Sequence, residues 1–211
     1  MSIRIHILNA NGKLSQLQHV IQKSSKSAIA HVIKSIPIDN VDIVFYESVQ
    51  RIIEHLGFGG HAVTKNTIFI PINPSFLNLE MSFKENLSRT IAHELYHCLR
   101  NFTAEGKHTL LEALVNEGLA DHFGIEITGK EPEKWDTALT KVQFKKLYKQ
   151  AEKEFDNSTY NHWAWFFGSQ KEGIPRWSGY TIGFAIVGDY LKKHPDQKPS
   201  NLYKAEAKEF I

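Results

Sequence analysis

Two histidines four residues apart, with an acid directly after the first, are the residues of this sequence best suited to chemistry. They lie in His93-Glu94-Leu95-Tyr96-His97, the H-E-x-x-H pattern on a predicted helix. Four residues advance an α-helix by about 400°, so His93 and His97 lie one turn apart on one face and can reach a single ion. Glu94 projects from the flank of that face, where a general base can deprotonate an attacking water. The pattern predicts a hydrolytic zinc site.

A third metal ligand is expected downstream, because catalytic zinc takes three protein ligands and leaves a fourth position open. The candidates are Glu105, His108, Glu112, Glu117, Asp121 and His122. The metzincin extension is excluded, because Arg100 and Thr103 stand where that pattern needs Gly and His. We favour Glu117, twenty residues after His97, on a second predicted helix that a turn near Gly106 would fold back against the first.

Asp121 follows Glu117 by four residues and so shares its helix face. A carboxylate there can accept a hydrogen bond from the distal ring nitrogen of a liganding histidine, which fixes the tautomer and raises the basicity of that ligand. Gly118 and Ala120 are small enough to let another helix approach closely. The alternative is that Glu117 only complements the helix dipole and Asp121 is exposed.

Composition and charge favour one ordinary soluble domain that binds neither nucleic acid nor membrane. The chain has 211 residues, with 25 Lys and Arg against 23 Asp and Glu, and its basic residues form no stripe. The longest apolar stretch, over 179–188, is about half the roughly 20 residues that span a bilayer. The single cysteine, Cys98, and an opening segment without the features of a secretory signal predict a cytoplasmic location.

Strands are expected in the first third of the chain and helices after it, which makes the fold class α+β. Alternating or β-branched patterns predict strands over 2–8, 41–46 and 67–72. A long amphipathic helix is predicted over 14–36, ended by Pro37. Because Pro71 removes a donor from the 67–72 strand, that strand is expected at a sheet edge.

Four further helices are expected after the strands. Ser82 and Glu85 resemble a capping box that opens a helix running to Leu99, and Thr109 and Glu112 repeat the signature. The second of these helices is expected to end near Gly124 or Gly129. Two more are predicted over about 135–155 and 179–194.

The motifs resemble a known class of enzymes. HELYH at 93–97 followed by NEGLAD at 116–121 resembles the gluzincin clan of zinc metallopeptidases, of which thermolysin is the best-known member. TIAHELYHCLR, TLLEALVNEGLADHF and GYTIGFAIVGDYL are similar to a family of predicted zinc-dependent proteases with compact catalytic domains and poorly defined substrates. The resemblance implies a zincin-like fold, with a small twisted sheet, an edge strand and an active-site helix, followed by a mainly helical C-terminal subdomain.

The resemblance also implies roles for single residues. It implies one Zn²⁺ per chain, held by His93, His97 and Glu117, with Glu94 as general base and proton shuttle. Asp121 would be a hydrogen-bonding partner of a ligand, His93 by preference. The substrate would be a peptide or protein.

Substrate binding is expected on the strand before the zinc helix, which in that clan pairs with an extended substrate at a sheet edge. The 67–72 strand would then bind the substrate backbone through Ile68, Phe69 and Ile70.

Peptide hydrolysis also needs a donor aimed at the oxyanion. By resemblance to clan members that use a Tyr or His from a later element, Tyr180 is preferred, with His162 and Arg176 as alternatives. The aromatic cluster over 162–167 can line a substrate pocket, although packing in the core is favoured. His61 can contact substrate, although a solvated loop position is favoured.

We therefore expect one zinc metallopeptidase domain over residues 1–211, with subdomains over about 1–101 and 102–211. Two alternatives stay open. One is a different hydrolase that uses the same zinc site, because fold and metal do not set the substrate. The other is a catalytically weak or inactive zinc-binding or protein-interaction domain that keeps the zincin fold.

Overall fold

The chain divides into two units in the computed structural model, which describes residues 2–103 and 107–211. The first unit is Met1–Gly106 and the second is Lys107–Ile211, and each is described here by itself. The candidate ligand Glu105 and the turn predicted near Gly106 lie outside the described residues. That the two units act as one catalytic domain stays a prediction.

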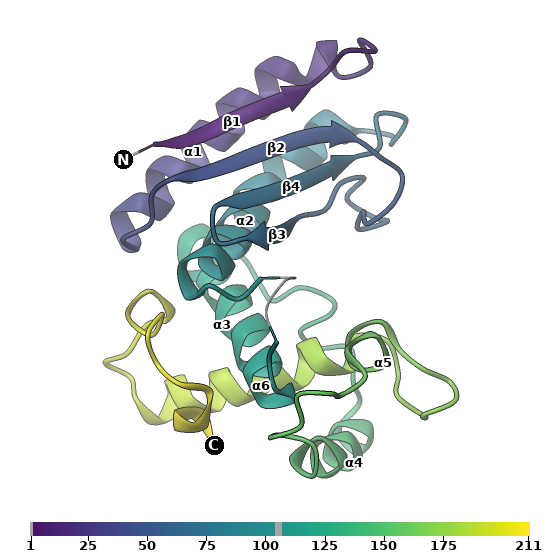
Figure 1. Cartoon of the computed structure of the whole chain (residues 1–211), viewed down its shortest axis with the longest axis vertical. Coiled ribbons are helices and arrows are strands. Elements are labelled where there is room, and N and C mark those ends of the chain that lie inside the picture. Colours follow the sequence, from purple (N-terminus) through teal and green to yellow (C-terminus); the bar gives the residue numbers. More distant parts are fainter. Residues whose placement is uncertain (1, 104–106) are drawn as a thin grey trace. The chain divides into compact units, whose positions relative to one another are not determined.

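The first unit contains a four-stranded mixed sheet with the order β1-β2-β4-β3 (Figure 1). Its strands are β1 (Ile3–Leu8), β2 (Val41–Glu47), β3 (His61–Thr64) and β4 (Thr67–Ile72). β1 pairs with β2 and β2 with β4 in parallel, whereas β3 is antiparallel to β4. The three predicted strands are therefore present, and β3 is an additional one. Its four residues, His-Ala-Val-Thr, do not alternate between polar and apolar, so no strand pattern predicts it.

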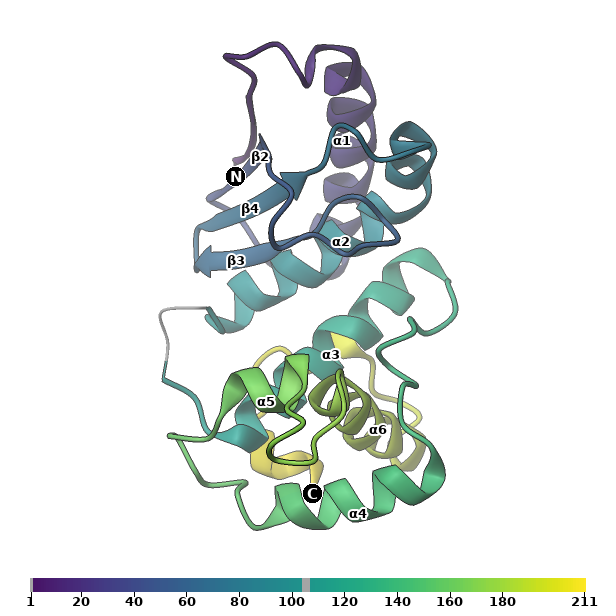
Figure 2. The same ribbon diagram turned by 90° about the vertical axis from the view of Figure 1, so that its right-hand side faces the viewer.

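Two helices, α1 (Gln18–Ser35) and α2 (Leu79–Arg100), pack against each other on one face of this sheet (Figure 2). α1 turns Val20, Ile21, Ala28 and Val32 into the core, as its predicted apolar spacing requires. It starts later than the predicted residue 14, because a 3₁₀ turn over Ser15–Leu17 comes first.

The predicted start of α2 is wrong. The helix begins at Leu79, after Asn78 in a left-handed conformation, so Ser82 lies inside it. Ser82 is buried, and its hydroxyl donates a hydrogen bond of 2.7 Å to the carbonyl of Leu56. A tertiary contact, not a capping box with Glu85, satisfies this side chain. The helix ends at Arg100, and the following Asn101 is also left-handed, with its N–H donating to the Cys98 carbonyl.

The prediction that the 67–72 strand forms a sheet edge is also wrong. β4 is paired on both sides, with β2 and with β3. The Pro71 carbonyl accepts a hydrogen bond of 3.2 Å from the N–H of Gly59. The backbone N and O of one strand residue point to the same side of the strand. The nitrogen of Pro71, which has no hydrogen to donate, therefore faces the segment before β3, where regular β3–β4 pairing has not begun. The pairing on both sides leaves Ile68, Phe69 and Ile70 unavailable for edge pairing with a substrate.

The second unit is mainly helical. It contains α3 (Leu110–Thr128), α4 (Lys141–Glu152), α5 (His162–Phe167), α6 (Ser178–Lys193), and two 3₁₀ turns at Pro199–Asn201 and Ala207–Phe210. The capping box of Thr109 and Glu112 is confirmed, and α3 stops at Gly129. The apolar stretch 179–188 lies within α6. Among the described residues, none of the helices is both long and apolar enough to span a bilayer.

The helix predicted over about 135–155 is shorter than expected. α4 starts after Thr140, whose side chain forms a capping box with Gln143. The segment before it is held by side chains instead: the Thr181 hydroxyl donates to the Trp135 carbonyl at 2.7 Å and accepts from the Ala138 N–H at 3.1 Å. These contacts come from a distant part of the chain, so local periodicity gives no sign of them.

The α3–α6 pair is the main packing contact of the second unit, and two glycines allow it. A Cβ on Gly118 would lie 2.2 Å from the Gly183 carbonyl oxygen, and one on Gly183 would lie 2.0 Å from the Leu114 carbonyl oxygen. Real Cβ atoms do not approach backbone this closely, so the helices would have to separate. The predicted close approach at Gly118 is therefore present, and it lies directly beside Glu117.

Replacing Gly118 with alanine should destabilise the second unit. The new methyl group meets backbone, which cannot move aside, and overpacking of this kind costs about 1–3 kcal/mol even though alanine favours helix by up to about 1 kcal/mol. Urea unfolding followed by circular dichroism measures the change. The control is Gly188→Ala on α6, whose Cβ would meet only the His122 ring, at 3.3 Å. Equal stability of the Gly118→Ala and wild-type proteins would contradict the close crossing.

Candidate metal centre

The imidazoles of His93 and His97 point their Nε2 atoms at each other from successive turns of α2. These nitrogens are 2.9 Å apart, and the ring centroids are 4.5 Å apart at an interplanar angle of 86°. Two nitrogens about 2.0–2.1 Å from a tetrahedral zinc ion lie about 3.3–3.4 Å from each other. A shift of about half an ångström would therefore fit this pair to one ion, as the four-residue spacing predicts.

The opposite side of α2 fixes where these imidazoles lie. Leu87, Ile91 and Leu95 are fully buried, and the following Tyr96 is buried as well. Such a buried stripe prevents rotation of the helix about its axis. His97 lies one turn from the helix end, where the chain reverses so that the Phe102 N–H bonds the His97 carbonyl at 3.0 Å.

Glu94 is buried against the start of β3. Its side chain is 5% exposed, and a Cβ on Gly60 would lie 2.8 Å from its Cγ and 2.9 Å from its Oε1. The backbone of Gly60 thus lies directly on the Glu94 side chain, in a place that only glycine leaves open. The edge of the sheet and the candidate general base are in contact within the first unit.

Cys98 takes no part in the metal centre, in agreement with its predicted place in the core. Its Sγ lies 3.6 Å from the Thr64 carbonyl of β3. Burial, and secondarily the charge of Glu94, raise the pKa of the Cys98 thiol to about 12. A thiol with this pKa stays protonated near neutral pH and is a poor zinc ligand.

His61 is a strand residue, and its interpretation as a solvated loop residue is wrong. It begins β3 and is half-buried, with its ring stacked on Phe69 at 5.8 Å between centroids. Burial, with a smaller contribution from the charge of Arg51, lowers the pKa of His61. The ring is therefore neutral over more of the physiological range than a free histidine.

Glu117 lies in the second turn of α3, in the second unit. It is 9% exposed, and the neighbouring Gly118 is the point where α3 meets α6. Other candidates on this helix have structural partners: Glu112 caps the helix by accepting the Thr109 N–H at 2.7 Å. His122 stacks on Phe184, with its Nε2 3.0 Å from the Phe184 carbonyl.

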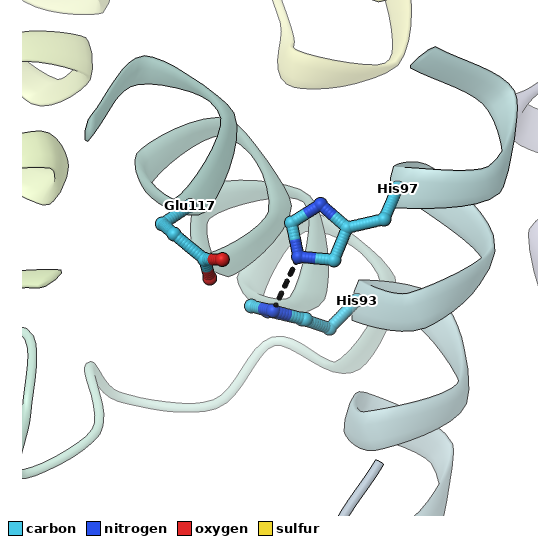
Figure 3. Close-up of side chains that lie close together, drawn as sticks. All are labelled: His93, His97 and Glu117. Carbon is cyan, nitrogen blue, oxygen red and sulfur yellow. Dashed lines mark hydrogen bonds between the residues drawn. The ribbon is translucent and has the colours of Figure 1, made fainter. Parts of the chain in front are cut away.

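His93, His97 and Glu117 each offer one ligand atom, and these atoms lie within 4.8 Å of one another (Figure 3). Among residues 2–103 and 107–211, they are the one group of three or more His, Cys, Asp and Glu side chains gathered this closely. Two imidazole nitrogens and one carboxylate oxygen are a donor set that suits zinc. The residues present therefore fit one zinc ion.

Asp121 is buried, so the alternative interpretation, in which this residue is exposed, is wrong. It is 2% exposed, and its Oδ2 accepts a hydrogen bond of 3.3 Å from the Trp135 indole N–H. Trp135 thus helps to orient the carboxylate one turn after Glu117. A hydrogen bond from Asp121 to His93 stays a prediction.

Tyr160 and His162 form a polar pair that no sequence motif combines. The Tyr160 hydroxyl and His162 Nδ1 are 2.9 Å apart. Burial, then the charges of Glu117 and Glu112, raise the pKa of Tyr160. Burial lowers the pKa of His162, although the charge of Glu117 acts in the opposite direction. Tyr160 belongs to no motif, so a spacing rule could not have found it.

The other two oxyanion candidates have different surroundings. The Tyr180 ring packs edge-on against Phe166, at 5.0 Å between centroids, and against Trp135 at 6.4 Å. Arg176 lies over the ring of Trp177, with 4.6 Å from its guanidinium carbon to the ring centroid. Phe166 also stacks on His162 at 4.5 Å, so Tyr180 supports the His162 ring through one intervening side chain.

These features together describe a candidate zinc site of the HExxH type in an α+β protein. Comparison with protein families matches residues 17–211 to the family described as "Predicted Zn-dependent protease (DUF2268)". The chain belongs to this family. The family covers the three segments on which the resemblance to predicted zinc-dependent proteases was based, so that part of the expectation is confirmed.

Similarity to individual proteins adds nothing further. No curated protein and no solved structure matches the chain. Membership of the gluzincin clan and the zincin-like fold stay predictions. The structure bears out the coarser description, a mixed four-stranded sheet with helices followed by a mainly helical part.

Replacing Gly60 with alanine should destabilise the first unit by about 1–3 kcal/mol, because the methyl group overlaps Glu94 and the Thr90 Cγ2. The double variant Gly60→Ala with Thr90→Ser removes one of the two overlaps and should recover only part of the loss. Urea unfolding of the three proteins measures this. Full recovery in the double variant would mean that the Glu94 contact is not the constraint.

Proposed function

We propose that this chain is a zinc-dependent peptidase that hydrolyses peptide bonds. The observation that carries the proposal is the gathering of His93, His97 and Glu117, with Glu94 buried next to the first histidine on the same helix. Membership of a family of predicted zinc-dependent proteases supports it. The three gathered side chains would hold one zinc ion.

Glu94 is proposed as the general base. In sites of this kind zinc supplies Lewis-acid polarisation of a carbonyl and lowers the pKa of water. Glu94 would take a proton from the attacking water and later deliver it to the leaving amine. The Gly60 backbone restricts where the Glu94 carboxylate can lie, which keeps this base in one position.

Substrate pairing is proposed for β3 in place of β4. β3 is the last strand of the sheet on that side, and its outer edge pairs with no further strand in the described part of the chain. An edge strand presents backbone groups that an extended peptide can pair with. Gly60 and His61 join this edge to the surroundings of Glu94, so a peptide paired with β3 would lie near the proposed base.

The oxyanion donor is proposed to be His162, oriented by Tyr160. The support is their 2.9 Å contact and the action of the Glu117 charge on both groups. Tyr180 remains a candidate, and its ring contact with Phe166 also gives it a structural role. A cytoplasmic location and the absence of nucleic-acid binding stay predictions.

The purified protein should contain one zinc ion per chain. Removing the carboxylate in Glu117→Ala should lower zinc affinity at least about tenfold, because two imidazoles alone leave the ligand set incomplete. Metal content by mass spectrometry, with zinc titration of the apoprotein, measures both. Glu112→Ala is the matched control, since that acid caps the same helix. Unchanged zinc affinity in Glu117→Ala would show that another residue is the third ligand.

Glu94→Gln should retain zinc and lose peptide hydrolysis by at least about a hundredfold, because the amide has almost the same shape but cannot accept the proton. Cleavage of a mixed peptide library, read by mass spectrometry, measures it. Wild-type protein that binds zinc and cleaves no peptide would favour the zinc-binding or interaction domain. Equal cleavage by both proteins would contradict the role of Glu94.

A further inference from the structure

Helix α4 presents five lysines to solvent from one face. All five are exposed, and the last directly follows the helix: Lys141, Lys145, Lys146, Lys149 and Lys153. At about 100° per residue they fall within an arc of about 140°, and the buried Leu147 and Ala151 lie on the opposite side. We call these five residues the lysine row. The expectation that the basic residues form no stripe is therefore wrong for this helix.

Packing in the second unit fixes which face carries the lysine row. α4 packs against α6 and lies along the lower edge of the unit in Figure 2. On its inner side, Phe144 and Tyr148 stack at 5.8 Å between ring centroids, and Tyr148 meets Phe155 edge-on at 6.1 Å. The capping box of Thr140 and Gln143 fixes the start of the helix. The helix thus has one rotational position, with the lysine row facing solvent.

No ion pair neutralises the lysine row. Among residues 2–103 and 107–211, none of its five ammonium groups takes part in an ion pair. Other exposed lysines do have acidic partners: Lys84 pairs with Glu80 at 2.7 Å, and Lys192 pairs with Asp189 at 3.0 Å. The face of α4 that carries the row includes one exposed acid, Glu152. Its positive charge is therefore available to a negatively charged partner.

The order of these charges opposes the stability of the helix. Lys141 is its first residue, where the positive end of the helix dipole disfavours a cation. Three lysine pairs are four residues apart, 141 with 145, 145 with 149 and 149 with 153, and like charges at this spacing repel. A surface that only needed solubility would gain from acids placed between these lysines. Charges kept together against local electrostatics indicate a binding function.

The spacing of the lysine row matches that of an extended peptide. Residues 141, 145, 149 and 153 succeed one another by about 6 Å along the helix axis, and alternate residues of an extended chain advance by about 6.6 Å. A carboxylate at every second position of such a chain can therefore meet one ammonium group each. Val142 lies on the same face, is 82% exposed and adds an apolar contact.

A protein segment fits this surface better than a nucleic acid or a membrane. Arginine and aromatic side chains are common partners of phosphates and bases, and the exposed face of α4 carries neither. A nucleic-acid strand also has a charge on every phosphate, whereas a peptide can place a neutral residue opposite Glu152. A membrane-binding helix turns an apolar side into lipid, but the apolar side of α4 faces the interior of the unit. Membership of a family of predicted proteases also favours a protein partner.

We propose that the lysine row binds an acidic segment of a protein partner, extended along α4 with Asp or Glu at alternate positions. The row shares no residue with the candidate metal centre, so this inference goes beyond the proposed peptidase function and does not depend on it. Because the charges are exposed, the binding has a modest affinity that falls as salt is added.

The experiment is an NMR titration of backbone amide shifts with a peptide of alternating Glu and Ser, in about 0.05 M salt, where exposed charges are weakly screened. The parent protein carries Glu94→Gln, so that no cleavage removes the peptide. We expect shifts at α4. Lys145→Glu with Lys149→Glu should weaken binding at least about tenfold. The matched control, Lys23→Glu with Lys26→Glu at exposed positions of α1, should weaken it less than about twofold.

Two further measurements separate the charge pattern from the amount of charge. A peptide of the same composition with its Glu residues in one block should bind about threefold more weakly, because it meets only part of the row. Lys145→Gln with Lys149→Gln should weaken binding of the alternating peptide about threefold, with an unchanged Tm by circular dichroism.

The other outcomes would overturn the proposal. Shifts confined to other elements, or equal weakening in the two double charge reversals, would show that the peptide follows net charge alone. Equal binding of the alternating and block peptides would contradict the extended arrangement. Tighter binding of the row to an oligothymidylate of equal charge, or to vesicles that contain phosphatidylserine, would assign it to nucleic acid or to lipid.

Discussion

The buried face of α2 is the constraint on which two candidate ligands of the first unit, the imidazoles of His93 and His97, depend. Their Nε2 atoms are 2.9 Å apart, about half an ångström closer than two nitrogens bound to one tetrahedral zinc ion. Holding them there requires a helix that cannot rotate, and the buried stripe of Leu87, Ile91 and Leu95 against α1 and the sheet provides this. Glu94, next to the first imidazole, is buried as well, so the two histidines and this acid share one rigid support.

The sheet supports that helix and also contacts the candidate general base, Glu94. Because β3 lies at the outer edge of the sheet and its preceding glycine rests on Glu94, a peptide added to this edge would be placed relative to the base by backbone alone. The Cys98 thiol also joins α2 to β3, through its contact with the Thr64 carbonyl. Backbone pairing of this kind would give affinity without selecting side chains.

The second unit carries the third candidate ligand, Glu117. The glycine crossing of α3 and α6 places Glu117 on a helix that packs backbone to backbone, and α5 packs on α6 with one set of aromatic rings while exposing another.

The sequence by itself determined the local parts of this protein: the two histidines and the acid on one helix, the α3 capping box, the strands over β1, β2 and β4, and Glu117 as a third ligand candidate. These follow from spacing, because helix and strand periods fix which side chains share a face. Only the tertiary structure decided that β4 is internal, that Ser82 bonds Leu56 and is not a cap, and that Tyr160 meets His162. Strand order and side-chain partners distant in sequence depend on packing between elements, and no local pattern encodes which element will lie alongside.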